Sequence, residues 1–350
     1  MSRIYYFNLA TYSQTGGIEN FNKTFLKALD KISNSITSIS VYDRENKENF
    51  DNIQFENFEK NKTKATLYVL KNIYKIDKLI LAHLNLLPIA IIAKFLNPKL
   101  KIYLSIYGIE VWKKLPFLYR FFFKKINILS ISNYTTEQFK QFNTLEDNNI
   151  FYLPPDTDIS INTNFDNVYS QNFFNILSVT RLDSNDSYKG VDSMIKTIPL
   201  LIKIIPNLKY TIIGKGNDKE RLEQLAKDLN VEQYIDFKGF VEYIEPYYQY
   251  CDIFVLPSKG EGFGIVYIEA MKYKKSCIAC DEGGQIDVVL DNVNGYLCQY
   301  DNINCLSNKI IHLYNDNKQR MKFGENGYGH LVENFTFDKF KDRLQAILSE

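Results

Sequence analysis

The chain has 350 residues, of which 45% are hydrophobic and 24% are charged, and its formal net charge is +1. This length exceeds the roughly 250–300 residues at which a single core stops growing, so two domains are expected. No apolar run reaches the ~18–20 residues of a membrane-spanning helix, and the N-terminal segment is too strand-like for a signal peptide. These features exclude an integral helical membrane protein and predict a cytoplasmic one.

The charges are divided unevenly along the chain. Residues 1–165 carry 21 Lys and Arg against 15 Asp and Glu, whereas residues 166–350 carry 21 against 26. A basic N-terminal half suits an anionic lipid surface or a diphosphate-linked acceptor better than nucleic acid, which usually requires a more concentrated charge. An ordinary lysine-rich solvated surface explains the same numbers equally well.

The five cysteines are odd in number and lie late in the chain, which is unlike a disulfide framework, so reduced thiols are expected. Cys277 and Cys280 have the spacing of a metal-binding or redox pair. No second pair and no histidine cluster accompanies them, and they fall in a predicted buried strand. We therefore interpret them as core residues and predict no metal site.

Strand-like and helix-like segments alternate along the whole chain. The first half predicts a strand at 4–8, a helix at 19–29, a strand at 78–83, a helix at 87–95 and a strand at 101–106. The second half predicts a strand at 174–179, a helix at 191–205, a strand at 209–214, a helix at 219–229 and a strand at 235–237. This rhythm is typical of parallel α/β sheets and predicts two Rossmann-like halves. Between them, 153–158 is proline-stiffened and 162–172 is polar, which favours a linker.

Several segments that follow predicted strands carry polar groups or glycines. Gly16 and Gly17 open the first helix, where consecutive glycines let the main chain approach a phosphate or a sugar. Residues 82–85 and 107–112 each follow a strand of the first half, at the carboxyl edge of the expected sheet. Polar side chains there are expected to line a ligand-binding cleft.

The second half holds the most specific pattern of the chain. Glu261 precedes a predicted helix that contains Glu269, and Gly262 and Gly264 lie in the turn between the strand and this helix. Glycines permit close approach of a ligand, and the free N–H groups of a first helical turn favour phosphate. One carboxylate can then meet a sugar while the other accepts hydrogen bonds from a ribose.

Two cations follow the first strand of the second half. Arg181 and Lys189 flank a polar loop that ends in Gly190. Fixed cations at such a place can neutralise the charge that develops on a departing nucleoside diphosphate. We therefore predict that no divalent metal is required.

The segment from Ser258 to Met271 resembles the Glu-x7-Glu signature of the retaining GT-B glycosyltransferases of family 4, and the Gly-Gly and Asn-Gly turns that follow it continue the resemblance. The Tyr188-Lys189-Gly190 version of the basic loop resembles xanthan- and acetan-type mannosyltransferases. The resemblance implies an α/β GT-B fold, in which two Rossmann-like domains face each other across a cleft. The expected N-terminal domain, which binds the acceptor, comprises residues 1–157 and is completed by a C-terminal helix at about 335–350. The expected C-terminal domain, which binds the donor, comprises residues 172–334.

The same resemblance implies the roles of individual residues. Glu261 contacts donor-sugar hydroxyls and acts with Arg181 and Lys189 as the catalytic group. The implied donor-binding residues are Gly16, Gly17, Gly214, Phe240, Val241, Gly262, Phe263, Gly264, Ile265 and Glu269, the last through the ribose.

On the acceptor side, Tyr107-Gly108-Ile109-Glu110 resembles the family's His-Gly-x-Glu segment, with tyrosine in place of the frequent histidine. His83 is the nearest alternative for that histidine's catalytic role, and a purely structural histidine at a strand end is equally compatible with the pattern. The predicted acceptor residues are Asn85, Tyr107 and Glu110.

Residues 112–125 interleave large apolar side chains with Lys and Arg. Such a segment can lie in a membrane interface, with its aromatic rings in the lipid and its lysines toward anionic headgroups. A buried helix whose lysines extend outward is the equally weighted alternative.

The predicted function is therefore retaining transfer of a hexose from a nucleotide diphosphate sugar to a glycan hydroxyl, in bacterial cell-surface polysaccharide synthesis. GDP-mannose is the favoured donor and a UDP-hexose the second choice, with no resident cofactor. The predicted partners are a glycan or lipid-linked oligosaccharide acceptor and an anionic membrane surface on the inner face of the plasma membrane, but no nucleic acid. Two alternatives stay open: a GT-B phosphorylase or sucrose/trehalose-type synthase, and a nucleotide-sugar-binding protein without turnover.

Overall fold

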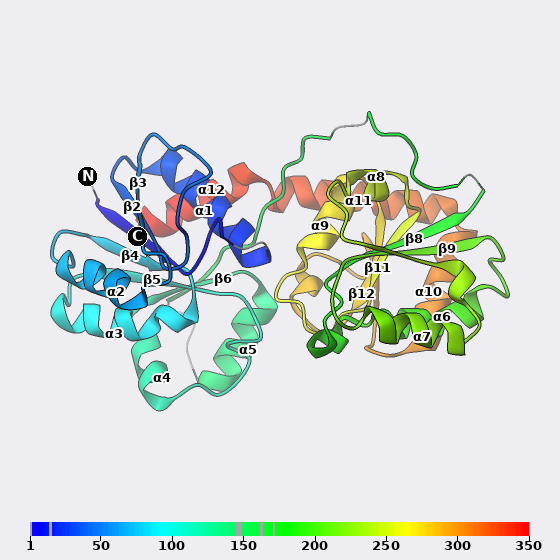
Figure 1. Cartoon of the computed structure of the whole chain (residues 1–350), viewed down its shortest axis with the longest axis horizontal. Helices are drawn as coiled ribbons and strands as arrows, with labels where there is room; N and C mark the ends of the chain where they lie inside the picture. Colours follow the sequence, from blue (N-terminus) through cyan, green and yellow to red (C-terminus); the bar gives the residue numbers. More distant parts are fainter. Residues whose placement is uncertain (1, 14–15, 145–148, 162–163, 171, 350) are drawn as a thin grey trace. The chain divides into compact units, whose positions relative to one another are not determined.

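The computed structural model of the chain describes residues 2–13, 16–144, 149–161, 164–170 and 172–349. It divides into two compact units (Figure 1). The first unit comprises Met1–Asp156 together with Thr336–Glu350, and the second comprises Thr157–Phe335. The chain thus returns to its first unit after completing the second.

The first unit is built on a parallel sheet with the strand order β3-β2-β1-β4-β5-β6-β7. In β5 every residue after the first is buried, as expected for a parallel strand that is covered on both faces. The strands are β1 Ile4–Asn8, β2 Ile36–Ser40, β3 Ile53–Asn57, β4 Lys78–Leu81, β5 Lys101–Ile106, β6 Asn127–Ser130 and β7 Ile150–Tyr152.

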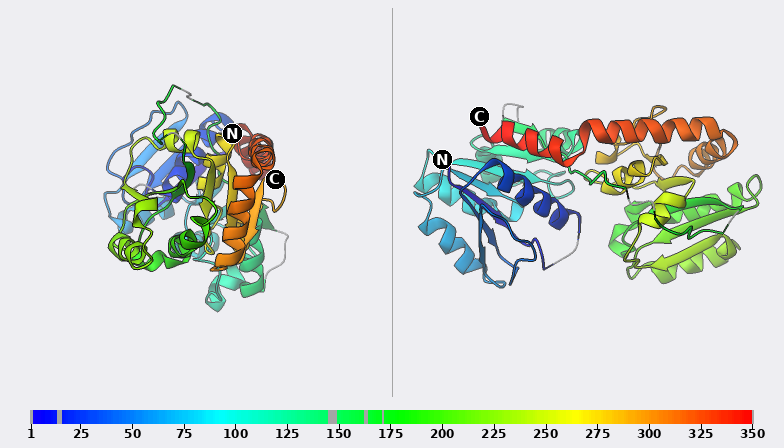
Figure 2. Two further views of the ribbon diagram at one scale, coloured as in Figure 1. Left: turned by 90° about the vertical axis from the view of Figure 1, so that its right-hand side faces the viewer. Right: turned by 90° about the horizontal axis from the view of Figure 1, so that it is seen from above.

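Helices cover both faces of this sheet (Figure 1). On one face, α12 lies beside α1 (Figure 2), and Phe340 of α12 packs edge-on against Phe21 and Phe25 of α1 at ring-centroid distances of 5.5 and 5.9 Å. The opposite face carries α2 and α3. The helical segments of this unit are α1 Gly17–Ile32, α2 Lys62–Lys71, η1 Leu84–Leu86, α3 Leu87–Leu96, α4 Phe117–Phe123, α5 Asn133–Asn143 and α12 Phe337–Ser349.

The second unit has its own parallel sheet, with the order β10-β9-β8-β11-β12-β13. All residues of β11 and β12 are buried, including Cys277 and Cys280, which confirms their interpretation as core residues. The strands are β8 Phe174–Val179, β9 Leu208–Ile213, β10 Ile235–Gly239, β11 Ile253–Leu256, β12 Ser276–Cys280 and β13 Gly295–Cys298.

In the second unit, α6 packs on α10 and α7, while α9 packs on α11. Figure 1 shows these two groups on opposite faces of the sheet. The helical segments are η3 Ser184–Lys189, α6 Val191–Leu201, α7 Lys219–Asp228, η4 Glu232–Tyr234, α8 Glu245–Tyr250, α9 Ile265–Lys272, η5 Gly284–Asp287, α10 Ile303–Asn315 and α11 Asn317–Asn334.

The polar stretch 164–170, the larger described part of the predicted linker, packs on the second unit and carries no helix or strand. The Tyr250 hydroxyl donates a 2.6 Å hydrogen bond to the Phe165 carbonyl, and the Tyr169 ring lies edge-on to Tyr247 at 5.8 Å. Tyrosines from α8 and from the segment itself hold it in place, so it behaves as part of the second unit.

Candidate functional site

The second unit has its topological switch point between β8 and β11. From β8 the chain progresses through β9 to β10 on one side, and from β11 through β12 to β13 on the other. In open parallel sheets, ligands bind outside the carboxyl ends of the strands at such a point. The loops after β8 and β11 carry Arg181, Lys189 and Glu261, so three predicted site residues lie at this edge.

The structure brings Lys189 and Glu261 together. The Lys189 Nζ lies 2.7 Å from Glu261 Oε1, and the two side chains are 18% and 13% exposed. Backbone contacts align the two loops, since the Lys259 N–H donates a 3.0 Å hydrogen bond to the Tyr188 carbonyl. Gly190, at φ +71°, lies so close to Pro257 that a Cβ would fall 2.3 Å from the Pro257 carbonyl oxygen. Only glycine fits this backbone position without strain.

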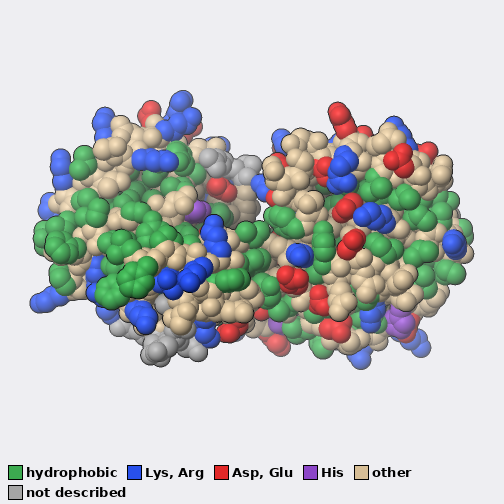
Figure 3. Space-filling model, turned by 90° about the horizontal axis from the view of Figure 1, so that it is seen from below, with side chains coloured by type: hydrophobic (Ala, Val, Ile, Leu, Met, Phe, Trp, Pro, Cys, Tyr) green, Lys and Arg blue, Asp and Glu red, His purple; other side chains and the backbone are tan. Residues whose placement is uncertain are grey.

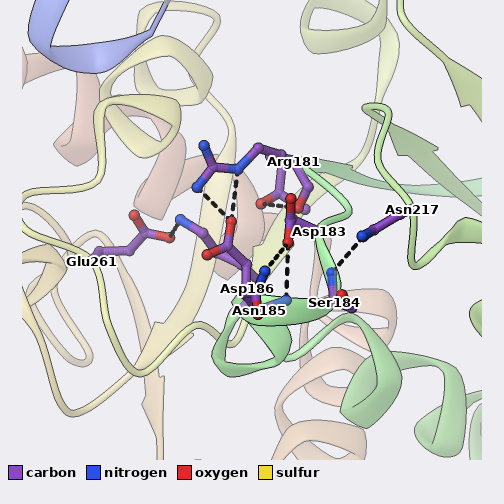
Figure 4. A network of polar contacts seen from close by, with 9 residues as sticks. Arg181, Asp183, Ser184, Asn185, Asp186, Asn217 and Glu261 are labelled. Atoms are coloured by element: carbon purple, nitrogen blue, oxygen red, sulfur yellow. Dashed lines mark hydrogen bonds and ion pairs between the residues drawn. The ribbon is translucent and has the colours of Figure 1, made fainter.

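Arg181 is held by a residue that sequence reasoning missed. Its guanidinium contacts Asp186 Oδ2 through Nε at 2.7 Å and through Nη2 at 2.5 Å (Figure 4). The Asp186 hydrogen bond is the main reason why the pKa of Arg181 is raised. Asp186 is nearly buried, whereas Arg181 is 67% exposed, so the guanidinium is fixed on one side and open to solvent on the other.

The loop after β12 supports the loop that carries Glu261. The Gly284 N–H donates a 2.6 Å hydrogen bond to the Glu261 carbonyl, and a Cβ at Gly284 would fall 1.9 Å from the Gly262 carbonyl oxygen. Gln285 is fully buried, and its Nε2 lies within 2.9 Å of the carbonyls of Ser258, Cys280 and Glu282. Gln285 therefore joins the loops after β11 and β12. The sequence analysis did not predict this role, because no local motif marks it.

The α9 helix begins directly after the glycine-rich turn. Its N-cap residue Gly264 has φ +94° and provides no side-chain cap, although the Tyr267 N–H donates a 3.0 Å hydrogen bond to the Gly264 carbonyl. The helix start therefore presents N–H groups that no side chain caps, as an anion site requires. Phe263 is buried, and Ile265 begins the helix. The predicted phosphate-binding residues 262–265 thus lie together at this helix start.

Glu269 lies one turn beyond the helix start and faces α8. Its carboxylate accepts a 2.8 Å hydrogen bond from the Tyr248 hydroxyl. Burial raises the pKa of Glu269 to about 7, and the Tyr248 hydrogen bond opposes this shift. A carboxyl with such a pKa changes charge near neutral pH, which makes its ligand contacts sensitive to pH.

Two further predicted donor-binding segments follow β9 and β10. The Gly214 N–H donates a 2.8 Å hydrogen bond to the Gly239 carbonyl, so the two strand ends are joined. Phe240 is 71% exposed, and the Lys215 Nζ lies 5.1 Å from its ring centroid. Val241 is partly buried. An exposed aromatic face at this edge offers a stacking surface for a flat ligand.

The first unit gathers its predicted residues at the carboxyl ends of β1, β4 and β5, which are neighbours in the sheet. Gly16 and Gly17 lie at the start of α1, and a Cβ on Gly16 would fall 2.7 Å from Glu19 Oε2. Thr15 lies outside the described residues. The His83 ring centroid lies 6.5 Å from that of Tyr107.

His83 and Tyr107 both make local hydrogen bonds. His83 Nδ1 accepts a 3.0 Å hydrogen bond from the N–H of Asn85, whose side chain is exposed. Burial lowers the pKa of His83, while the charges of Glu110 and Glu19 raise it. The Tyr107 hydroxyl donates to the Ala82 carbonyl at 3.0 Å, and the Tyr107 N–H donates to Glu110 Oε1 at 2.6 Å. Because His83 Nδ1 accepts the Asn85 hydrogen bond, the neutral ring carries its proton on Nε2, which can donate to a ligand oxygen. Glu19 is the member of this group that the sequence analysis did not single out.

Asp43 positions the loop that leads to Gly16. Its buried carboxylate accepts hydrogen bonds from the N–H groups of Thr11, Tyr12 and Ser13 at 2.8–3.1 Å and from the Ser40 hydroxyl at 2.8 Å. A carboxylate with this many donors fixes the loop conformation. The residue lies 30 or more positions away from the loop that it holds, so sequence reasoning missed it.

Across 2–13, 16–144, 149–161, 164–170 and 172–349, no group of three or more His, Cys, Asp or Glu side chains is arranged to hold a metal ion. None of the helices in these ranges combines the length and the apolar character needed to cross a bilayer.

Comparison with known proteins gives a family match for the second unit. Residues 163–330 match the family model "Glycosyl transferases group 1", which covers just under half of the chain. The poly(ribitol-phosphate) alpha-N-acetylglucosaminyltransferase of Staphylococcus aureus is 29% identical over 44% of this chain and 32% of its own length. A GDP-mannose-dependent monoacylated alpha-(1-6)-phosphatidylinositol monomannoside mannosyltransferase of Corynebacterium glutamicum is 31% identical over 46% of this chain and 44% of its own length. The matches thus span less than half of these relatives.

Solved structures match almost the whole chain at low sequence identity. HepE of Anabaena in complex with UDP superposes with a TM-score of 0.80 at 16% identity, covering 99% of both chains. The sucrose-phosphate synthase of Thermosynechococcus elongatus gives a TM-score of 0.79 at 16% identity, covering 99% of this chain and 98% of its own. The predicted GT-B fold is confirmed, and the family match is confined to the second unit.

Proposed function

We propose that this chain is a glycosyltransferase that moves a hexose from a nucleotide diphosphate sugar to a hydroxyl of a glycan. The observation that carries the proposal is the Lys189–Glu261 ion pair, 2.7 Å across, at the switch point of the second unit beside the uncapped start of α9. A cation, a carboxylate and the N–H groups of a helix start can together hold a sugar diphosphate. The group 1 family match over the same unit supports this proposal.

In the proposed reaction, Lys189, Arg181 and the first-turn N–H groups of α9 hold the diphosphate. Their charges and dipoles stabilise the negative charge that grows on the leaving group as the bond to the sugar breaks. Glu261 orients the sugar through its hydroxyls, and Glu269 accepts hydrogen bonds from the ribose. The acceptor hydroxyl attacks from the face on which the diphosphate leaves, and a phosphate oxygen takes its proton, so the anomeric configuration is retained.

The first unit is proposed to bind the acceptor through Asn85, Tyr107 and Glu110. His83 is proposed to take the catalytic role that the resembled family gives to a histidine at this place. Burial lowers the pKa of His83 and favours the neutral ring, whose Nε2–H can donate a hydrogen bond to an acceptor oxygen. The acceptor is proposed to be a glycan of bacterial cell-surface polysaccharide, and the Staphylococcus aureus relative, which is named for transfer to poly(ribitol phosphate), supports a polymeric bacterial acceptor.

We propose GDP-mannose as the donor and a UDP-hexose as the second choice. The Tyr188-Lys189-Gly190 loop and the GDP-mannose-dependent relative favour the first, whereas the fold match to HepE with UDP favours the second. Because two fixed cations face the leaving group, activity is proposed to be independent of divalent metal. Full activity after treatment with EDTA is the expected result, and an absolute requirement for a divalent ion would overturn this part of the proposal.

The proposal is tested by incubating the purified chain with a panel of nucleotide sugars and measuring the released nucleoside diphosphate. Turnover of one sugar donor is expected, with Glu261→Gln slower by roughly 10²-fold because the sugar is no longer held for reaction. Glu333→Gln, an exposed substitution on α11 of the same unit, is the matched control and should keep wild-type activity. Binding of nucleotide sugars without any turnover would support the non-catalytic alternative and contradict the proposal.

A further inference from the structure

One face of the first unit exposes an unusual number of large apolar side chains. We define the α3–α4 face by six of them, in α3 and α4: Ile92, Phe95, Leu96, Phe117, Leu118 and Phe121. Phe95 is 87% exposed and Phe117 is 76% exposed. Tyr74, which is also exposed, donates a 3.0 Å hydrogen bond to the Leu96 carbonyl and extends this face. Clusters of exposed apolar groups mark interaction surfaces, whereas single ones need no explanation.

The α4 helix is divided between core and solvent. Phe122 and Phe123 are buried and belong to the core of the first unit, and Phe117, Leu118 and Phe121 point away from it. For residues 112–125 the burial of Phe122 and Phe123 fits the buried-helix alternative, and the exposed rings leave the interfacial alternative for the proposal below. The helix is anchored by two aromatic rings and still offers three apolar side chains to an outside partner.

The α3–α4 face is strongly basic. Residues 87–125 contain eight Lys and Arg and one acidic residue, Glu110. The carboxylate of Glu110 accepts a hydrogen bond from the Tyr107 N–H. Burial and the charge of Lys125 both lower the pKa of Lys94, which places basic groups of α3 and of the end of α4 near one another. Figure 3 shows hydrophobic and basic side chains side by side on the first unit in the view from below.

Cations also lie over the exposed rings of α4. The Lys125 Nζ lies 4.4 Å from the Phe121 ring centroid, and the Arg120 guanidinium lies 5.9 Å from that of Phe117. Lys113, Lys114, Lys124 and Lys125 are all exposed at the two ends of this helix. Apolar groups that can enter a lipid interface are thus flanked by charges at the level of the headgroups.

We propose that the α3–α4 face docks the first unit onto a membrane surface rich in anionic lipid. The mixture of exposed apolar side chains and excess positive charge complements a negatively charged bilayer. A second copy of this chain is a poorer occupant, because two such basic faces would repel one another. The docking does not depend on the proposed catalytic function. Together with that function, it would bring the first unit to a lipid-linked acceptor.

The proposal predicts salt-sensitive binding to vesicles in a sedimentation assay with the full chain. At low salt the chain is expected to sediment with vesicles of phosphatidylglycerol and phosphatidylcholine, and not with phosphatidylcholine alone. Each Lys or Arg near an anionic surface multiplies the partition coefficient by about fivefold. The patch variant, in which four lysines become Gln, should therefore lose on the order of several hundred-fold in binding: Lys113→Gln, Lys114→Gln, Lys124→Gln and Lys125→Gln.

A control variant separates the patch from the overall charge. It removes the same charge from exposed positions of the second unit, through Lys203→Gln, Lys227→Gln, Lys318→Gln and Lys322→Gln, and should bind far better than the patch variant. A third variant, Phe117→Ser with Phe121→Ser, replaces only exposed rings, so it should fold and lose binding at moderate salt. Circular dichroism checks the fold of each variant.

Three outcomes would overturn the proposal. The first is no binding of wild-type chain to anionic vesicles at low salt. The second is equal loss of binding in the patch and control variants, which would indicate a general charge effect. The third is a combination of two results: the wild-type chain does not bind vesicles, and it forms a concentration-dependent dimer that the variant with Phe117→Ser and Phe121→Ser does not form. None of these assays uses a sugar donor, so failure here is distinguishable from failure of the catalytic proposal.

Discussion

The two cations of the second unit are held differently, and this difference predicts different effects of substitution. Lys189 contacts Glu261, which is proposed to hold the sugar, whereas Arg181 is fixed by Asp186. Lys189→Gln and Arg181→Gln should each lower the turnover number by about 10²-fold or more, because each removes charge stabilisation from the transition state. Steady-state kinetics with the preferred donor measures this.

Asp186 is a positioning residue in this account, so Asp186→Asn should have a smaller effect on turnover than Arg181→Gln. The guanidinium remains but loses its fixed partner. Lys203→Gln, an exposed change on the same unit, is the control for charge. Turnover of Arg181→Gln within twofold of wild type would contradict the assigned role of the arginine.

The raised pKa of Glu269 predicts that the free energy of unfolding depends on pH in a specific way. Its pKa is about 7 in the folded chain because of burial, against an ordinary value of 4.5. Its contribution to folding is therefore complete below about pH 4.5 and is lost as the pH rises through 7. Glu269→Gln has no such loss. The melting temperature of the variant, relative to wild type, should rise between pH 5 and pH 8 and level off above.

The same group should make nucleotide binding depend on pH. Only the ionised carboxylate accepts two ribose hydrogen bonds, so the affinity of the wild-type chain for its nucleoside diphosphate should increase from pH 6 to pH 8. Titration of the nucleotide phosphate affects wild type and Glu269→Gln alike, so the ratio of their affinities isolates the carboxyl. A constant ratio over this range would remove Glu269 from the ribose site.

The sequence pointed more readily to the proposed ligand-binding residues than to the residues that hold their loops in place. Lys189 and Glu261 were predicted because they lie in compact motifs beside glycines and strand ends. Asp43 and Gln285 act on backbone groups up to about 30 positions away, and an isolated Asp or Gln carries no sign of such a partner. Asp186 is a similar case, because it lies in a polar segment whose sequence is typical of a solvent-exposed loop.

At the scale of elements, α12 is predicted to stabilise the first unit from the far end of the chain. Phe340 is 1% exposed and packs on two rings of α1. Phe340→Ala should lower the free energy of unfolding of the first unit by about 3–5 kcal/mol, through lost burial and a residual cavity. Urea denaturation followed by circular dichroism measures this. Lys339→Ala, an exposed neighbour on α12, should change the unfolding free energy little.

The strands that sequence reasoning found are those with continuous apolar runs. β1, β5 and β8 have the predicted bounds, because buried parallel strands give an unambiguous pattern. β2 and β3 were not predicted. β2 reads Ile-Thr-Ser-Ile-Ser, and the edge strand β3 reads Ile-Gln-Phe-Glu-Asn, and such polar sequences resemble loops. The predicted helix at 191–205 was too long, because apolar residues continue past the last helical turn. In the structure α6 ends at Leu201.

At the scale of the whole molecule, the charge division along the sequence corresponds to a division of tasks in our proposals. The basic excess of residues 1–165 lies within residues 87–125, the segment that includes α3 and α4. The second unit, which the family match covers, carries the proposed donor site. Sequence composition indicated this division but could not place the exposed rings of α4, because only the fold decides which rings are buried.

The central claim is that the second unit holds the diphosphate of a sugar donor at Lys189. Calorimetric titration of the wild-type chain with a nucleoside diphosphate and with the corresponding nucleoside tests it most directly. The diphosphate is expected to bind at least tenfold more tightly, and Lys189→Gln should reduce that difference by about tenfold or more, since a charge-assisted hydrogen bond contributes ~1.5–3 kcal/mol. Equal affinities for the two ligands, or an unchanged difference in Lys189→Gln, would contradict the account.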